Sequence, residues 1–270
     1  MRDRAVAIPG TAPMGPDFTL TKWYMDVVDE HQNAYIGYWV ALTWRKLQLQ
    51  GDHHLLRTAR DGVTTHGGLS ALPPPTCESD TQIRWRSDEY TGLWSAAADP
   101  IRATLFQSER GAIRWECLMP KARGEIDLPQ LSIRGWGYLE RLEMTLPVWD
   151  LPFKRLYWGR CHTANHYLVW IQWSGATSQS LAWHNGLCLS DLTITDRLIE
   201  TSECRLTIDH RVPLRQGQLI STIFRPLGAV TKLLPRPAFM AHERKWLGHG
   251  TLHVEAGSEP ATILYEEVTW

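Results

Sequence analysis

A carboxyl group with aromatic neighbours stands out in residues 134–143, which read RGWGYLERLE. If this segment is a strand, Trp136, Tyr138 and Glu140 share one face, because successive side chains of a strand point to opposite sides. Burial among aromatic rings disfavours the charged form of a carboxyl group and so raises its pKa. A raised pKa is what a general acid needs near neutral pH. We therefore expect Glu140 to donate a proton, with Tyr138 beside it as a proton relay.

Further candidates lie in the run YWGRCH, which ends at His162. On a strand, Trp158, Arg160 and His162 would share a face, and this face would supply an aromatic wall and a second proton-transfer group. A different pairing is equally open at this point. Glu140 could form a buried salt bridge with Arg160 or with Arg141, and would then hold the fold together without doing chemistry.

Two histidine pairs are the candidates for a metal site. His53 and His54 are adjacent, so on a strand they would point in opposite directions. His162 and His166 flank a predicted turn and could converge, but no third ligand lies nearby in the sequence. We therefore expect no metal. The motifs of nucleotide binding, serine hydrolysis and zinc proteolysis are absent from the sequence, so nucleotide-driven and serine-hydrolase chemistries are not expected.

The composition narrows the class of protein. The chain has 270 residues, a net charge of −1, and 14 Trp against 5 Phe. A nearly neutral chain without lysine or arginine runs is not typical of nucleic-acid-binding proteins, and no run of 18 apolar residues predicts a membrane span. Five cysteines with no C-x-x-C pair favour buried thiols and a cytoplasmic protein. The excess of tryptophan predicts wide packed interiors or a cavity for an apolar ligand.

Apolar and polar residues alternate over most of the chain, as they do in β-strands. The strands predicted in this way are residues 21–28, 34–50, 81–87, 91–96, 101–108, 112–119, 131–146, 155–162, 166–173, 179–184, 187–193, 204–209, 219–224, 250–255 and 261–268. Asn185-Gly186 predicts a tight type I′ hairpin turn, which requires a positive φ at both residues. The segments expected to be irregular or helical are an arm at 1–20, a short helix at 52–61, a proline-rich loop at 67–77, and a helix or loop at 227–237.

This number of strands, without a long helix, predicts an all-β fold. Closure of the sheets into barrels would remove the exposed edges that many strands create. We expect two lipocalin-like antiparallel β-barrels (calycin-like) in tandem. Residues 120–129 are the candidate boundary, so the expected domains are residues 1–125, with an extended N-terminal arm, and residues 126–270.

Short motifs along the chain resemble those of a known family. The run WYMD (residues 23–26) is similar to the E-W-W-Y-F-D opening of the carotenoid 1,2-hydratase and hydroxyneurosporene synthase group. The run GWGYLE (135–140) resembles the G-x-G-Y/W-x-D-H/R segment at the start of that group's second barrel. The run YWGR (157–160) looks like its W-x-W-G-R strand, and Trp246 with residues 265–270 resembles the closing strands.

The resemblance implies two β-barrel domains, no cofactor, and an inter-strand cavity that holds a long apolar molecule. Members of the wider group hydrate, cyclise or join polyenes, terpenoids and polyketides. By the resemblance, Glu140 takes the place of the family's acidic residue and Tyr138 that of the aromatic residue before it. The opening motif adds Trp23, Tyr24 and Asp26 to the expected substrate-binding residues.

The sequence departs from the family's pattern at three places. Lys22 stands where the opening glutamate is expected, and Glu140 replaces an aspartate. The run RLEM (141–144) stands where the family often has His-Asn-Trp-Gly. The loss of that histidine disfavours simple alkene hydration and leaves cyclisation, isomerisation and ligand binding open.

Three functions are therefore carried forward. The first is a cofactor-independent cyclase or hydratase, in which Glu140 protonates a double bond or epoxide of an apolar polyene or terpenoid, and Tyr138 or His162 removes the final proton. The rings expected to stabilise the developing carbocation, each by about 0.5–2 kcal/mol, are Trp136, Trp158 and Trp170. The second is a pericyclase, which only folds a polyene or polyketide into a reactive shape. The third is a carrier of an apolar ligand without chemistry.

Overall fold

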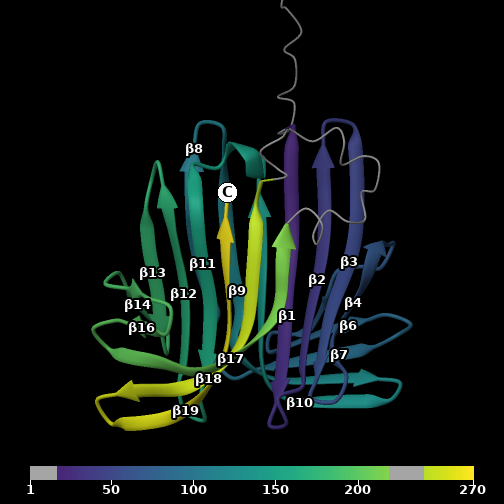
Figure 1. Cartoon of the computed structure of the whole chain (residues 1–270). Coiled ribbons are helices and arrows are strands. Elements are labelled where there is room, and N and C mark those ends of the chain that lie inside the picture. Colours follow the sequence, from purple (N-terminus) through teal and green to yellow (C-terminus); the bar gives the residue numbers. More distant parts are fainter. Residues whose placement is uncertain (1–16, 219–239) are drawn as a thin grey trace, which may run out of the picture.

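The computed structural model describes residues 17–218 and 240–270, and these residues form β-strands along most of their length. The strands make two curled antiparallel sheets, one of ten strands and one of nine (Figure 1). The first sheet is drawn in purple to teal and the second in teal through green to yellow. The expected all-β class is confirmed. No helix in the described part of the chain is long and apolar enough to cross a membrane.

The first sheet is built around the N-terminal strand. Its strands are β1 (Phe18–Asp29), β2 (Ala34–Trp44), β3 (Leu47–Thr58), β4 (Gly62–Leu69), β5 (Thr76–Ser79), β6 (Gln82–Arg86), β7 (Thr91–Ala96), β8 (Ile101–Ser108), β9 (Gly111–Leu128) and β10 (Leu131–Met144). Their order is β4-β3-β2-β1-β10-β9-β7-β6-β5, and β8 pairs with β9 off this path. β10 thus returns to lie beside β1, which places residues far apart in the sequence side by side, such as Tyr24 and Glu140, 116 positions apart.

The second sheet repeats this arrangement with shorter outer strands. Its strands are β11 (Phe153–His162), β12 (Tyr167–Gly175), β13 (Gln179–His184), β14 (Leu187–Leu189), β15 (Thr193–Ile194), β16 (Leu198–Glu200), β17 (Cys204–Gln218), β18 (His242–Val254) and β19 (Gly257–Thr269). Their order is β14-β13-β12-β11-β19-β18-β17-β16-β15, so the last strand closes against β11.

The described residues form three separate apolar cores. Tyr24 of β1 and Trp158 of β11 belong to a core with members from both sheets, which we call the inter-sheet core. Trp23, the neighbour of Tyr24, points to the opposite side of β1 and packs in a core made by the first sheet alone. Trp170 packs in a third core, made by the second sheet alone. Alternation along each strand therefore decides which of the three interiors a side chain enters.

Several predicted elements are confirmed. The strand expected at 131–146 is β10, and those expected at 155–162 and 166–173 are β11 and β12. Asn185 and Gly186 have φ angles of 48° and 89°, as a type I′ turn requires. The strand expected at 219–224 and the interruption expected at 227–237 lie outside the described residues, as does most of the N-terminal arm.

Other local predictions are wrong. Residues 52–58 are not helical but belong to β3, which pairs with β2 on one side and β4 on the other; these ladders override the local pattern. The strand expected at 34–50 is two strands, because the chain turns at Arg45, whose φ is 55°. The irregular loop expected at 67–77 is shorter, since β4 ends at Leu69 and β5 begins at Thr76. Cys77 and Cys188 are exposed, so only three of the five thiols are buried.

The change from one sheet to the other comes later than the expected boundary. Residues 125 and 126 lie inside β9, and β10 pairs with β1 and β9 of the first sheet. Sheet membership changes between Met144 and Phe153, where the chain has only a single 3-10 turn, Val148–Asp150. We therefore propose a domain boundary within residues 145–152. Residues 120–129, where the boundary was expected, mostly belong to β9, which runs on to Leu128.

Candidate functional site

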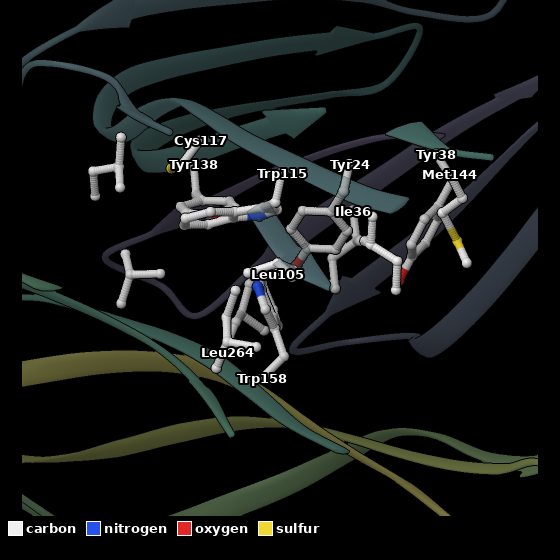
Figure 2. Packing of buried hydrophobic residues seen from close by; sticks show 14 of the residues in the cluster. Tyr24, Ile36, Tyr38, Leu105, Trp115, Cys117, Tyr138, Met144, Trp158 and Leu264 are labelled. Atoms are coloured by element: carbon white, nitrogen blue, oxygen red, sulfur yellow. The ribbon is translucent and has the colours of Figure 1, made fainter. Parts of the chain in front are cut away.

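Glu140 is the centre of a buried hydrogen-bond cluster in the inter-sheet core. Its side chain accepts three bonds at Oε2: 2.6 Å from Trp115 Nε1, 2.6 Å from Tyr138 Oη and 3.2 Å from Trp158 Nε1. The residue is only 6% exposed. The donors come from β9, β10 and β11, so both sheets contribute to the site (Figure 2). In the figure, Tyr24, Tyr138 and Trp115 of the first sheet lie opposite Trp158 and Leu264 of the second.

Two irregularities in the pairing of β9 with β10, with the extra residues on β9, lie beside Tyr138 and Glu140. The pairing of β10 with β9 shifts register between Gly137 and Leu139 and again between Leu139 and Glu140. Gly137 makes a close approach possible here, because a Cβ at this position would lie 2.6 Å from the backbone oxygen of Asp26. The same approach lets Trp94 Nε1 donate to that oxygen at 2.9 Å. Such bulges commonly re-aim a side chain beside a functional site.

The surroundings of Glu140 act on its acidity in opposite directions. Burial raises the pKa of Glu140, because a charged carboxylate loses its hydration there. The charge of Lys22 and the hydrogen bonds from Tyr138 and Trp115 oppose this, and the net direction is upward. Since all three donors converge on Oε2, the proton of the neutral acid belongs on Oε1. This arrangement gives a buried acid whose proton can be donated from one defined oxygen.

Asp26 and Arg160 form a second buried pair, which links the two sheets. Arg160 Nη2 contacts Asp26 Oδ1, Arg160 Nε lies 3.3 Å from Oδ2, and both side chains are fully buried. Burial raises the pKa of Asp26, and the guanidinium of Arg160 opposes that rise. Arg160 is thus paired with Asp26, and Arg141 pairs with Glu116 at 2.8 Å. Neither arginine forms the salt bridge with Glu140 that the sequence left open.

His162 occupies a separate position at the end of β11. It is 1% exposed, and its Nε2 lies 2.7 Å from the backbone oxygen of Pro120, so Nε2 carries a proton and donates it. Burial lowers the pKa of His162 well below its ordinary value, and the charge of Arg160 lowers it further. The imidazole is therefore neutral. In the described part of the chain it makes no hydrogen bond with Glu140 or Tyr138, so the structure does not bring this expected proton-transfer group to the carboxyl.

The expected tryptophan wall is only partly assembled. Trp158 reaches Glu140, but Trp170 and Trp23 face the second-sheet and first-sheet cores. Trp136 is half-buried and lies against two cations, with Lys121 Nζ 4.1 Å and the Arg123 guanidinium carbon 3.6 Å from its ring centroid.

The third hydrogen-bond donor to Glu140 is Trp115, which the sequence analysis missed. Trp115 lies on β9, 25 residues before Glu140, and nothing local to either residue shows that the two strands pair. Its ring also lies against Trp183 of β13, with centroids 5.0 Å apart. A strand pattern that places an indole on the inward face of β9 is the one signal that could have identified it.

Tyr24 connects the carboxyl cluster to a group of buried charges. Its ring lies edge-on to Tyr138, Trp158 and Tyr38, at centroid distances of 5.9, 4.9 and 5.3 Å. Tyr24 lies between Tyr138 and Tyr38 in Figure 2. On the Tyr38 side, Lys245 Nζ is 4.7 Å from the Tyr24 centroid. The side chains of this charged group, which the sequence analysis also missed apart from Lys22, are Lys22, Arg215, Glu243, Lys245 and Glu266.

The histidines considered as metal ligands are dispersed. His54 stacks on His66 in the first sheet, whereas His53 lies against Tyr38 on the other face of β3. His166 stacks on His184 near the turn that follows β13. Within residues 17–218 and 240–270, no three metal-ligating side chains come together.

Comparison with known proteins identifies the fold. No protein-family model matches the sequence, and no curated protein matches it. Among solved structures, a protein named AttH from Nitrosomonas europaea is 14% identical, with a TM-score of 0.57 and coverage of 98% of this chain and 99% of that one. Kievitone hydratase from Nectria haematococca is 11% identical (TM-score 0.52; coverage 97% and 94%), and CghA bound to Sch210972 is 10% identical (TM-score 0.52; coverage 94% and 89%). Likenesses at this level of identity show the fold, which is that of two lipocalin-like β-barrels in tandem.

Proposed function

We propose that the protein is a cofactor-independent cyclase or hydratase that protonates an apolar polyene or terpenoid-type substrate. The observation that carries this proposal is Glu140 itself: a buried carboxyl with a raised pKa, held by three donors on one oxygen and surrounded by aromatic rings. A general acid for an unreactive carbon–carbon double bond needs this combination of retained proton and water exclusion.

The proposed reaction begins with proton transfer from Oε1 of Glu140 to one carbon of the double bond. The π electrons form the new C–H bond, and the neighbouring carbon becomes a cation. Tyr24 and Trp158 lie in the same core and can stabilise that cation through their ring faces, by about 0.5–2 kcal/mol each. The three donors on Oε2 stabilise the carboxylate that the transfer leaves behind.

The cation then has two outcomes, and both restore the acid. In a hydratase, water adds to the cationic carbon and the resulting oxonium loses a proton to Glu140. In a cyclase, a second double bond of the same substrate attacks the cation, and loss of a neighbouring C–H proton to Glu140 ends the reaction. Neither outcome needs an oxidant, a reductant or a metal. Tyr138, hydrogen-bonded to Glu140, is the residue placed to relay the returning proton.

Two of the similar solved structures support this proposal. One of them is a hydratase by name, and another was solved with an organic compound, Sch210972, bound. Both share the tandem-barrel fold over almost their whole length. A fold that accommodates a hydratase and a bound organic molecule is compatible with the chemistry proposed for Glu140.

A pericyclase is the second candidate, because the aromatic rings around Tyr24 could fold a polyene without proton transfer. In that case Glu140 would only accept hydrogen bonds. A carrier is the third candidate, and it would use the same rings for binding alone.

Mass spectrometry in D2O separates these functions. Compounds that co-purify with the protein are extracted, identified, and incubated with fresh protein in D2O. A proton-driven cyclase gives an isomer of the substrate in which one hydrogen on carbon is replaced by deuterium. A hydratase gives a product that has gained one molecule of D2O. A product that forms without deuterium on carbon would indicate a pericyclase and would refute proton donation by Glu140. Recovery of the unchanged compound would indicate a carrier.

A further inference from the structure

The charged group beside Tyr24 contains more cations than carboxylates. Lys245 Nζ lies 2.5 Å from Glu266 Oε2, and Arg215 Nε lies 3.1 Å from Glu243 Oε2. Lys22 has no carboxylate within ion-pair distance among residues 17–218 and 240–270. Its Nζ instead lies 5.4 Å from the ring centroid of Tyr38.

The group cannot balance its own charge. Burial alone would raise the pKa of Glu266, but Lys245 and Lys22 lower it to about 2, so this carboxylate stays charged. Burial raises the pKa of Glu243, and Arg215 opposes that rise. The two glutamates therefore neutralise at most two of the three cations. One positive charge, on the half-buried Lys22, is left without a carboxylate partner in this group.

Two further atoms of the group have unused bonding capacity. Arg215 Nε and Glu243 Oε2 are buried, and despite their short separation neither has a hydrogen-bond partner of normal geometry in the described part of the chain. The other end of Arg215 is fixed, because Nη2 donates to the hydroxyl of Tyr38 at 2.8 Å. An ordered guanidinium with a free donor is a common way to hold a carboxylate or enolate.

The group is partly exposed to solvent. Lys22 is half-buried, and the side chain of Glu266 is 13% exposed. A ligand can therefore approach these charges from the solvent side, at Lys22.

The position of Tyr24 links the group to the proposed acid. Tyr24 contacts Tyr138 and Trp158 on the side of Glu140, and Tyr38 and Lys245 on the side of the charged group. An extended apolar molecule that packs against Tyr24 thus has Glu140 at one part of its body and Lys22 with Lys245 and Arg215 near its end.

We propose that the substrate carries an anionic headgroup, a carboxylate or an enolate, and that Lys22 binds it together with Arg215. This inference rests on the proposed function, since it names the substrate class of the same site. The anion supplies the negative charge that the group lacks. It also fixes the direction in which the substrate lies, with the headgroup at Tyr38 and the double bonds at Glu140.

Paired probes that differ only in the headgroup test this inference. All-trans-retinoic acid and all-trans-retinol form one pair, and palmitic acid and hexadecanol form the other. Retinoid binding is followed by quenching of tryptophan fluorescence, and binding of the saturated pair by its displacement of retinol, at low ionic strength and neutral pH. We expect the wild type to bind each acid about tenfold or more tightly than its alcohol, a difference of about 1.4 kcal/mol. Added salt should reduce the preference.

Lys22→Met is the variant that isolates the headgroup contact. It should weaken binding of the acids about tenfold and leave the alcohols unchanged, because methionine keeps most of the apolar length of the side chain and loses the charge. Lys46→Met is the matched control, since Lys46 is exposed in the turn after β2 and far from the group in its sheet. It should change neither affinity.

Equal affinities for acid and alcohol in both pairs, or an equal loss of both in Lys22→Met, would overturn the anionic headgroup. This failure is distinguishable from failure of the proposed function. The preference for acids depends on Lys22 and persists if Glu140 donates no proton, whereas deuterium incorporation depends on Glu140 and persists if the headgroup is neutral.

Discussion

Asp26 of β1 and Arg160 of β11 form a fully buried ion pair that joins the two sheets. Both residues lie in the short runs that resemble a known family, at the opening of the chain and 134 positions later. The pair is therefore part of what holds the two halves of the site in a fixed relation. Trp158, which donates to Glu140, is two residues from Arg160 on the same strand.

Replacing Asp26 by Asn should destabilise the protein strongly. The substitution leaves the guanidinium of Arg160 buried without a counter-charge, which typically costs about 3–5 kcal/mol. Urea denaturation followed by tryptophan fluorescence measures the loss. Glu200→Gln breaks an exposed pair with Arg205 and should cost less than about 1 kcal/mol. If both variants lost the same stability, the buried pair would have no special role.

The hydrogen bonds on Glu140 should set the pH range of activity. The pKa of Glu140 in the folded protein lies above the ordinary value of 4.5, so the acid is protonated below its raised pKa and loses its proton as the pH rises through it. Activity should follow the same course, present at low pH and lost on the basic side. Tyr138→Phe removes a bond that favours the carboxylate, so the basic limb of the pH profile should move to higher pH.

Trp115→Phe should move the basic limb in the same direction, because it removes a second donor and keeps an aromatic ring. The pH dependence of turnover, measured for each variant against the wild type, checks both shifts. A shift to lower pH in either variant would mean that these donors do not stabilise the carboxylate.

Stability should also depend on the charge of Glu140. Because the pKa is raised in the folded state, the neutral carboxyl contributes stability that is present below pH 4.5 and is lost as the pH rises through the raised value. Glu140→Gln has no charge to bury. The free energy of unfolding of the wild type should therefore fall relative to that of this variant as the pH increases above 4.5. A constant difference over that range would contradict the raised pKa.

Gly159→Ala should destabilise the second sheet. A Cβ at Gly159 would overlap the indole of Trp170, which is 1% exposed and has no room to move away. Overpacking of this kind costs about 1–3 kcal/mol. Gly68→Ala is the matched control, since a Cβ there meets nothing within 4 Å. Thermal or urea unfolding of both variants checks the difference, and equal stability would show that the indole yields.

The periodicity of the sequence is sufficient to predict the fold class and many of the strands. β10 to β13 follow the predicted spans because each is a single run of alternating residues that ends at a clear turn, as at Asn185. The point at which the chain passes from the first sheet to the second, between Met144 and Phe153, could not be found in this way. Pro120 and Pro129 look like breaks in the sequence, but Pro120 lies within β9, a strand of 18 residues. The pairing between strands decides where one sheet ends, and the residue pattern of one strand does not show which strand it pairs with.

The carboxyl at the centre of the site and two of its three hydrogen-bond donors could be predicted, but the third donor and the neighbouring charged group could not. Glu140 and Tyr138 are two residues apart, so a strand pattern places them together. Trp158 was also identified, from its own aromatic motif. Trp115 and Lys245 reach the site only because β9 and β18 are paired in particular sheets. Trp170 is expected beside Glu140 but packs in the core of the second sheet. Alternation shows which residues share a side of a strand, but not which core that side faces.

The most direct test of the central claim compares Glu140→Gln with Glu143→Gln under single-turnover conditions, with the substrate identified from the purified protein. Both residues lie on β10, but Glu143 is partly exposed and makes none of the buried bonds of Glu140. We expect Glu140→Gln to lower the rate at least about 100-fold, the range typical of a lost general acid, with unchanged substrate binding and an intact fold. Glu143→Gln should keep the wild-type rate. A Glu140→Gln variant that turns over substrate at the wild-type rate would contradict proton donation by Glu140.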